Sequence, residues 1–127
     1  MLKPLVAACV GLTLAAALPV QAQRNFTAQA LRGELQVTQP PAALLNGKPV
    51  QLAPGARIRD EQNLLLVSAA LAGRKLVVYY TLEPGTGHLQ DVWVLTRTEA
   101  ARKPWPTTAK EAQAWKFNEF TQTWTKP

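Results

Sequence analysis

Residues 75–98 read KLVVYYTLEPGTGHLQDVWVLTRT, and this stretch decides the fold. Leu76–Leu82 and Leu89–Leu95 are rich in valine, leucine and aromatic residues, which favour β-strands. Between them, Pro84 fixes the backbone angle that a turn requires, and Gly85 tolerates positive φ. The pattern predicts an antiparallel hairpin. Because an isolated hairpin is only marginally stable, we expect the preceding segments to complete a sheet around it.

The preceding segments are short and are separated by proline and glycine. Residues 30–39 alternate apolar and polar side chains, which predicts a half-buried strand with a bulge or bend at Gly33. Asn46-Gly47 predicts a type I′ hairpin turn, and Pro54-Gly55 predicts a second turn. Leu64–Val67 is an uninterrupted apolar run, as in a strand covered on both sides. Together these segments predict a mainly β fold, a small antiparallel barrel of five to six strands.

The composition changes after Thr98. Thr108-Ala109-Lys110-Glu111 has the capping-box pattern, which predicts a short helix over Ala109–Ala114. Residues 115–117 and 123–125 flank a polar turn and predict a small terminal hairpin. We therefore expect three parts: a signal peptide at 1–22, a small β-barrel domain at 23–98, and a C-terminal appendage at 99–127 that packs on the barrel.

The N-terminal residues have the pattern of a cleaved secretory signal. Lys3 precedes the uncharged apolar run Leu5–Leu18, and Val20-Gln21-Ala22 predicts cleavage between Ala22 and Gln23. The run is shorter than the about 20 residues of a membrane span. A lipid-modified Cys9 is the minor alternative. The sequence thus predicts a periplasmic or secreted protein without a stable transmembrane span after processing.

The processed chain is small, basic and free of cysteine. Removing 22 of the 127 residues also removes the single cysteine and Lys3, which leaves a net charge of +5. A positive net charge favours anionic partners through long-range attraction. In an exported protein we expect these to be an envelope protein or an anionic envelope polymer or lipid, and we expect no nucleic-acid partner.

Several segments also resemble a known group of proteins. LNGKPVQLAPGARIR and VWVLT, followed by PWPTT and TQTWTKP, are similar to a group of small exported (periplasmic) proteins of Gram-negative bacteria. The resemblance implies export and a shared fold, and it supplies no catalytic residues. The layout around Gly33, Gly73 and the last hairpin is loosely similar to OB-type and SH3-type barrels, which implies nothing about function.

Catalytic chemistry has few candidate residues. The processed chain has one serine, Ser68, and one histidine, His88, with Asp91 or Asp60 as orienting acids, and no nucleophile elbow surrounds the serine. His88 and Asp91 alone are too few for a zinc site. We therefore expect no enzyme, no cofactor and no metal, with a small hydrolase as the third hypothesis.

Two surfaces are candidates for binding. Arg57 and Arg59 lie two residues apart in a predicted strand, so their side chains share one face. The candidate ligand-binding residues are Arg57, Arg59, Arg74, Lys75, Tyr80 and Trp93. The candidate partner-binding residues are Trp105, Trp115, Phe117 and Trp124, for which packing onto the barrel is the favoured alternative. The leading hypothesis is a non-catalytic exported module that binds an anionic ligand or a protein, and the second is an accessory subunit that docks through its aromatic C-terminus.

Overall fold

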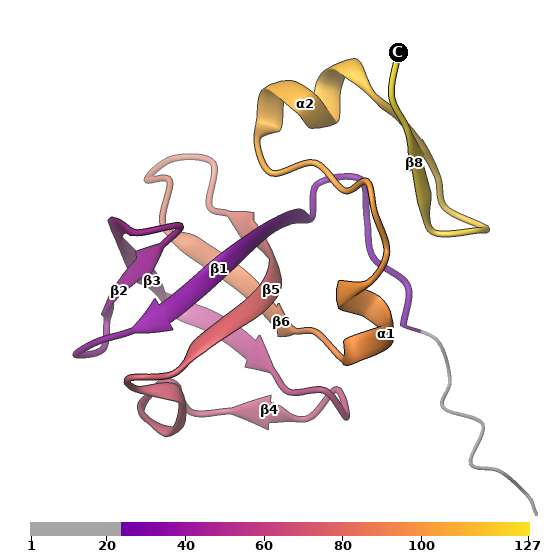
Figure 1. Ribbon diagram of the computed structural model, residues 1–127. Helices are drawn as coiled ribbons and strands as arrows, with labels where there is room; N and C mark the ends of the chain where they lie inside the picture. Colours follow the sequence, from indigo (N-terminus) through magenta and orange to yellow (C-terminus); the bar gives the residue numbers. More distant parts are fainter. Residues whose placement is uncertain (1–23) are drawn as a thin grey trace, which may run out of the picture.

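The computed structural model describes residues 24–127, so the predicted signal peptide and its cleavage site lie outside the described residues. The fold is mainly β, with a barrel and a smaller C-terminal appendage (Figure 1). Its elements are β1 (Leu31–Val37), β2 (Ala42–Leu45), β3 (Lys48–Arg59), β4 (Leu65–Leu66), the 3₁₀ turn η1 (Ser68–Leu71), β5 (Lys75–Leu82), β6 (Leu89–Val94), α1 (Arg97–Ala100), α2 (Ala109–Ala114), β7 (Lys116–Asn118) and β8 (Thr123–Thr125).

Five of the strands close into a barrel, which confirms the predicted fold class. The sheet order is β2-β1-β5-β6-β3-β4, and β2 also pairs with β3, so the ring closes and β4 remains as an extra strand outside it. Four of the barrel pairings are antiparallel, as expected, but β3 and β6 pair in parallel. The parallel pairing follows from the long crossover through β4, η1 and β5 that separates the two strands in the chain.

The predicted hairpin turns are confirmed. Asn46 and Gly47 have φ of 53° and 80°, which are the positive angles that a type I′ turn requires. In the turn between β5 and β6, the Glu83 amide donates to the His88 carbonyl at 2.7 Å. The stretch that decides the fold therefore forms the expected hairpin.

Two predicted strand irregularities are absent from the structure, a turn at Pro54-Gly55 and a bulge at Gly33. Pro54-Gly55 does not end a strand: β3 continues through it, and the irregularity is a register shift between Leu52 and Arg57 against β6. Gly33 is not a bulge, because the pairing of β1 with β5 is regular on both sides of it. Glycine is required there for space, since an added Cβ would lie 3.0 Å from both Leu45 Cδ1 and Tyr80 Cε1.

The barrel wall separates two apolar cores because side chains alternate across each strand. Val78 and Tyr80 of β5 point inward, whereas Tyr79 between them points outward. The inner core contains Leu31, Leu35, Val37, Ala43, Leu45, Leu52, Ile58, Leu71, Val78, Tyr80, Leu89, Val92 and Val94. The outer core, between the wall and the appendage, contains Phe26, Ala30, Tyr79, Leu95, Trp105 and Trp124, with Trp93, Trp115 and Phe117 packed against it.

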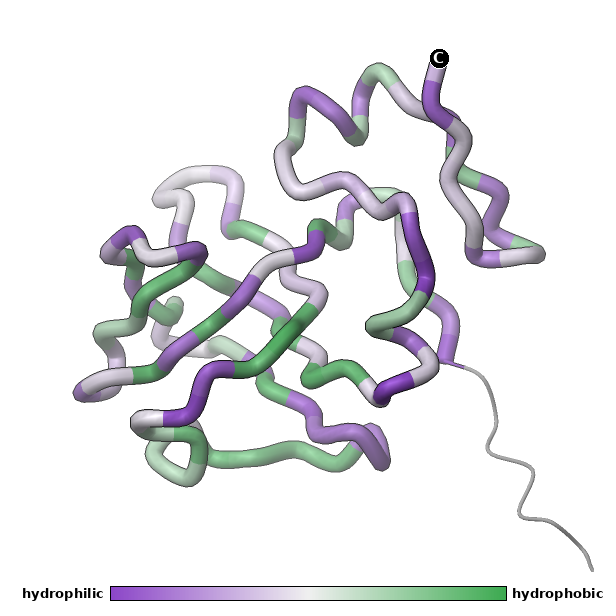
Figure 2. Tube along the Cα trace, viewed as in Figure 1, coloured by the Kyte–Doolittle hydropathy of each residue, from purple (hydrophilic) through white to green (hydrophobic). Residues whose placement is uncertain are grey.

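Two segments differ from expectation in their burial. The polar composition of Gln23–Gln29 predicts a loosely held lead-in, but Phe26 is buried in the outer core and Arg24 is largely buried. Leu64–Val67 was expected to be covered on both sides. Instead Leu64, Leu65 and Val67 are 63%, 65% and 73% exposed, and the segment forms a hydrophobic strip at one end of the barrel (Figure 2).

Within residues 24–127, no helix has the length and apolar character that crossing a membrane would require.

Candidate functional site

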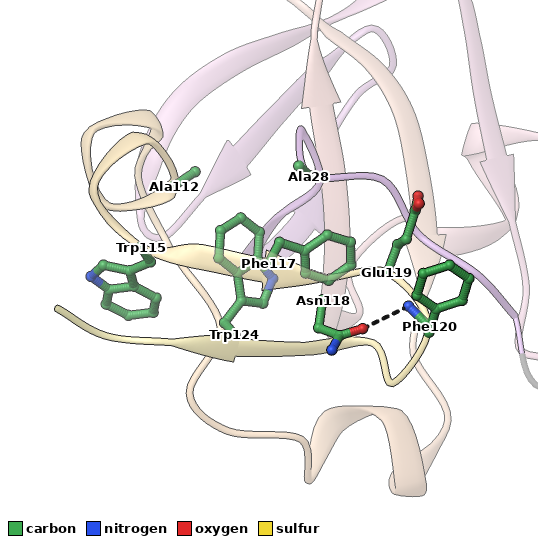
Figure 3. Close-up of a pocket in the computed structure, with 8 residues that line it drawn as sticks. All are labelled: Ala28, Ala112, Trp115, Phe117, Asn118, Glu119, Phe120 and Trp124. Atoms are coloured by element: carbon green, nitrogen blue, oxygen red, sulfur yellow. Dashed lines mark hydrogen bonds between the residues drawn. The ribbon is translucent and has the colours of Figure 1, made fainter.

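The candidate site is an open pocket in the appendage, which we call the aromatic pocket. It has a volume of about 610 Å³ and lies between the N-terminal segment, α2 and the β7–β8 hairpin (Figure 3). Its walls carry three aromatic residues from the hairpin and a fourth, Trp115, which caps the C-terminal end of α2. The lining residues are Ala28, Ala112, Trp115, Phe117, Asn118, Glu119, Phe120 and Trp124.

A continuous series of aromatic contacts fixes the floor of the pocket to the barrel. Trp105 stacks on Tyr79 of the barrel wall, with ring centroids 4.1 Å apart and planes at 15°. Trp105 also meets Trp124 edge to face at 5.9 Å, and Trp124 lies 4.8 Å from Phe117. The Trp105 indole Nε1–H donates to the Ala30 carbonyl at 2.9 Å, which sets the ring's orientation. Each aromatic pair of this kind contributes about 0.5–1.5 kcal/mol beyond the burial of its surface, so these contacts hold the base of the pocket firmly against the barrel.

Buried Gln122 attaches the hairpin to the N-terminal segment. Its Oε1 accepts from the Phe26 amide at 2.8 Å, and its Nε2 donates to the Phe26 carbonyl at 3.3 Å and to the Glu119 carbonyl at 2.9 Å. The side-chain amide thus pairs with Phe26 as a neighbouring strand would. Because Gln122 is 1% exposed, these three bonds are shielded from water.

The hairpin turn holds Phe120 at the rim of the pocket. The Asn118 carboxamide oxygen accepts from the amides of Phe120 at 2.9 Å and Thr121 at 3.1 Å, so the side chain closes an Asx turn (Figure 3). The Phe120 side chain is 90% exposed. A rigid turn therefore presents a phenyl ring to solvent beside an apolar hollow.

Helix α2 forms the opposite wall, and it begins as predicted. The Thr108 hydroxyl accepts from the Glu111 amide at 3.1 Å. The Glu111 carboxylate reaches one residue further back than a capping box requires and accepts from the Thr107 amide at 2.9 Å. That backbone hydrogen bond, followed by the bond from the Thr107 hydroxyl, lowers the pKa of Glu111.

A buried ion pair positions the start of the appendage. Arg24 makes two charge-assisted hydrogen bonds to Glu99 of α1 and also donates to the carbonyls of Asp60 and Val94, both at 2.9 Å. Burial is the largest influence on the pKa of Glu99 and raises it. Hydrogen bonds from Arg24 and Thr96, together with the charges of Arg24 and Arg102, outweigh burial and lower that pKa below its usual value. Glu99 is therefore ionised and structural.

The Tyr79 hydroxyl lies in the interface between barrel and appendage. Burial raises its pKa to about 12, although the nearby charges of Arg32 and Arg102 act in the opposite direction. Arg32 is the cross-strand neighbour of Tyr79 on β1. The group stays neutral at physiological pH, and the appendage covers it.

The predicted ligand-binding residues do not form one surface. Arg57 and Arg59 share the outward face of β3, but their neighbours on β6 are Asp91 and Trp93. The carboxylate of Asp91 therefore offsets part of the positive charge on this face.

Arg74 and Lys75 lie elsewhere on the barrel. Lys75 pairs with Gln36 of β1, whereas Trp93 pairs with Tyr79, about 13 Å further along β5. Tyr80 lies inside the barrel and is 4% exposed, so its predicted place beside this surface is wrong. The reason is the alternation along β5, which directs Tyr79 outward and Tyr80 inward.

The predicted partner-binding residues divide into two groups. Trp105 and Trp124 are buried, as the packing alternative expected, and contribute to the pocket's base. Trp115 and Phe117 are half-buried and line the pocket. Phe120 belongs to the same group of C-terminal aromatic residues that the sequence offers for partner binding. Gln122 was missed, because nothing local to it indicates that it reaches Phe26.

The structure does not bring the candidate catalytic residues together. Ser68 lies in η1, before β5 begins, and His88 lies in the turn after β5 ends. The eight-residue strand β5, about 26 Å long, runs between them in the chain. Among residues 24–127, no group of three or more metal-ligating side chains is close enough to hold an ion.

Comparison with known proteins finds no matching family model, no matching curated protein and no matching solved structure.

Proposed function

We propose that the protein is a non-catalytic binding module of the cell envelope that docks a protein partner through its aromatic pocket. The observation that carries the proposal is Phe120, which is 90% exposed at the rim of an open, mainly apolar hollow of about 610 Å³. The proposal joins the leading hypothesis from the sequence, a non-catalytic exported module that binds a protein, to the aromatic C-terminus of the second hypothesis, and the dispersal of the basic residues supports it over an anion-binding surface.

The chemistry of the pocket fits an apolar segment of a protein. Trp115 and Phe117 offer half-buried rings beside Phe120, and aromatic side chains of this kind dominate the binding energy of protein interfaces. The pocket is also preorganised, because the aromatic series and Gln122 hold its walls before any partner arrives. Little conformational entropy is then lost when the partner binds.

The envelope location is part of the proposal and rests on the N-terminal sequence. Its pattern of Lys3, an apolar run and Ala22 is typical of a secretory signal. We also propose an OB-type barrel rather than an SH3-type one. The support is the single parallel pairing between β3 and β6 within a Greek-key layout.

Capture from an envelope extract tests the proposal with a matched pair of variants. Phe120→Ser removes the exposed ring at the pocket, and Leu82→Ser removes a 41% exposed apolar side chain on the barrel. The partner recovered by the wild type should be recovered equally by Leu82→Ser and at least tenfold less by Phe120→Ser, at unchanged melting temperature. A tenfold loss corresponds to about 1.4 kcal/mol, the scale of an interface hot spot. Equal recovery of the partner by both variants would contradict the proposal that the aromatic pocket is the docking site.

A further inference from the structure

A second candidate surface, separate from the aromatic pocket, is the open edge of β4. In the described part of the chain, β4 pairs only with β3, through Arg59↔Leu65 and Ile58↔Leu66. Figure 1 shows it running along one end of the barrel, away from the appendage. An unpaired edge presents backbone donors and acceptors to which another strand can add.

The register shows which backbone groups face the open side. The Asp60 amide donates to the Leu64 carbonyl at 2.8 Å, so Asp60 and Leu64 form a hydrogen-bonded pair. In an antiparallel ladder such pairs alternate with pairs whose N–H and C=O groups point away from the partner strand. The amide and carbonyl of Leu65 therefore face outward. The amide of Val67 does too, because Val67 is still extended, with φ of −82° and ψ of 142°.

The side chains of this edge are apolar and uncovered. Leu64, Leu65 and Val67 are 63%, 65% and 73% exposed, and only Leu66 packs against the inner core. Figure 2 shows the strip as a continuous hydrophobic segment. The sequence pattern is that of a strand covered on both sides, yet residues 24–127 cover one side only. Contiguous exposed apolar side chains of this kind are typical of interaction sites.

The net charge of the molecule decides between occupants. Arg59 lies directly across from Leu65, and Arg57 shares its outward face, where Asp91 offsets part of its charge. Of the other nearby acids, Asp60 is engaged in its own turn, where its Oδ1 accepts from the amides of Gln62 and Leu64, and Glu61 is exposed. Residues 24–127 carry a net charge of +5, so two copies meeting at this edge would repel each other, and long-range attraction favours an acidic partner.

We propose that β4 docks an extended segment of another protein, apolar at its centre and acidic at its flanks, which adds to the sheet as a seventh strand. The backbone groups of Leu65 and Val67 supply the ladder, and the exposed leucines and valine cover the apolar centre. An added strand lies about 10 Å from β3, so the stems of Arg57 and Arg59 extend toward its carboxylates.

The test uses a soluble probe, the acetylated and amidated peptide Asp-Glu-Thr-Val-Ile-Val-Thr-Glu-Asp. Titration into ¹⁵N-labelled protein should shift the amide signals of Leu65 and Val67 and slow their hydrogen exchange. A probe with lysine at every acidic position should bind at least tenfold more weakly. Absence of a shift at both amides, or equal affinity for the two probes, would overturn the proposal.

Two variants separate strand addition from other contacts. Leu65→Pro removes an outward donor without breaking a hydrogen bond of the fold, and Leu65→Glu keeps the backbone but repels the acidic flanks. Each should weaken the probe at least tenfold, whereas Phe120→Ser at the aromatic pocket should leave its affinity unchanged.

Three results would overturn the assignment. The first is wild-type affinity in folded Leu65→Glu. The second is a wild-type dimer in sedimentation that Leu65→Glu dissociates, which would identify a second copy as the occupant. The third is adsorption to phosphatidylglycerol vesicles that Leu65→Glu abolishes while the peptide fails to bind, which would identify a lipid surface.

Discussion

At the scale of single residues, Gly33 shows how the wall of a small barrel depends on the absence of one side chain. Gly33→Ala should lower the free energy of unfolding by about 1–3 kcal/mol, because its Cβ would lie 3.0 Å from both Leu45 and Tyr80 in a filled core. Gly55→Ala is the matched control, since an added Cβ there meets nothing within 4 Å. Urea unfolding of both variants measures the difference. An equal effect of the two substitutions would show that space is not what Gly33 provides.

Because of the Arg24–Glu99 pair, the free energy of unfolding should decrease when the pH becomes acidic. Because the pKa of Glu99 is lowered in the folded protein, its stabilisation is fully present above the ordinary carboxyl pKa of about 4.3 and is lost as the pH falls through the lower folded-state value. Glu99→Gln leaves Arg24 buried without its counter-ion, and should cost about 3–5 kcal/mol at pH 7.

Urea unfolding as a function of pH checks this prediction. The difference between wild type and Glu99→Gln should shrink as the pH falls below about 4.3. Glu61→Gln at an exposed position is the control and should change stability by less than about 0.5 kcal/mol. A difference that stays constant down to strong acid would mean that the carboxylate charge does not contribute.

At the scale of elements, the terminal hairpin depends on Gln122 more than on its own two short strands. Gln122→Leu removes three hydrogen bonds and leaves the Phe26 amide buried without an acceptor, so we expect a loss of about 2–4 kcal/mol. Gln113→Leu on the exposed face of α2 is the control and should change stability by less than about 0.5 kcal/mol. Thermal or urea unfolding distinguishes the two, and an equal loss would show that the hairpin is held by its aromatic contacts alone.

Local patterns predicted some elements and missed others for identifiable reasons. Asn46-Gly47 and Thr108 fix a turn and a helix start through their own side-chain and backbone chemistry, so both were predictable. Thr96 and Glu99 carry the same capping signal for α1 and were overlooked. Pro54-Gly55 has the composition of a turn, but β3 continues through it, because strands remote in the chain pair with β3 on both sides of these residues, up to Leu52 and again from Arg57. Such tertiary pairing leaves no local signal.

The candidate site was predictable in its residue types and not in its geometry. The aromatic C-terminus was evident from the sequence, but which rings are buried depends on how the appendage meets the barrel wall. Tyr79 and Tyr80 are adjacent and chemically identical. Only the orientation of β5 within the barrel wall determines that Tyr79 enters the outer core and Tyr80 the inner core. The dispersal of Arg59 and Lys75 likewise follows from strand order, which no pattern within either strand specifies.

At the scale of the whole molecule, barrel and appendage should unfold together. The protein has four tryptophans, and all of them lie in the outer core or pack against it: Trp93, Trp105, Trp115 and Trp124. Their fluorescence therefore reports the interface between barrel and appendage. Amide circular dichroism reports mainly the barrel. Because Tyr79 and Phe26 bind the two parts into one core, the urea transitions from both signals should coincide. Val78→Asp, which changes only the inner core, should abolish both signals. Separate midpoints would show that the appendage is an independent unit.

The central claim, that the aromatic pocket is the docking site, is tested most directly by photo-crosslinking in the native cells. A benzophenone amino acid replaces Phe120 at the pocket rim and, as the control, exposed Thr86 in the β5–β6 turn. Irradiation should give a discrete adduct with one envelope protein from position 120 and none from position 86. The absence of an adduct at position 120, or the same adduct from both positions, would contradict the proposed function.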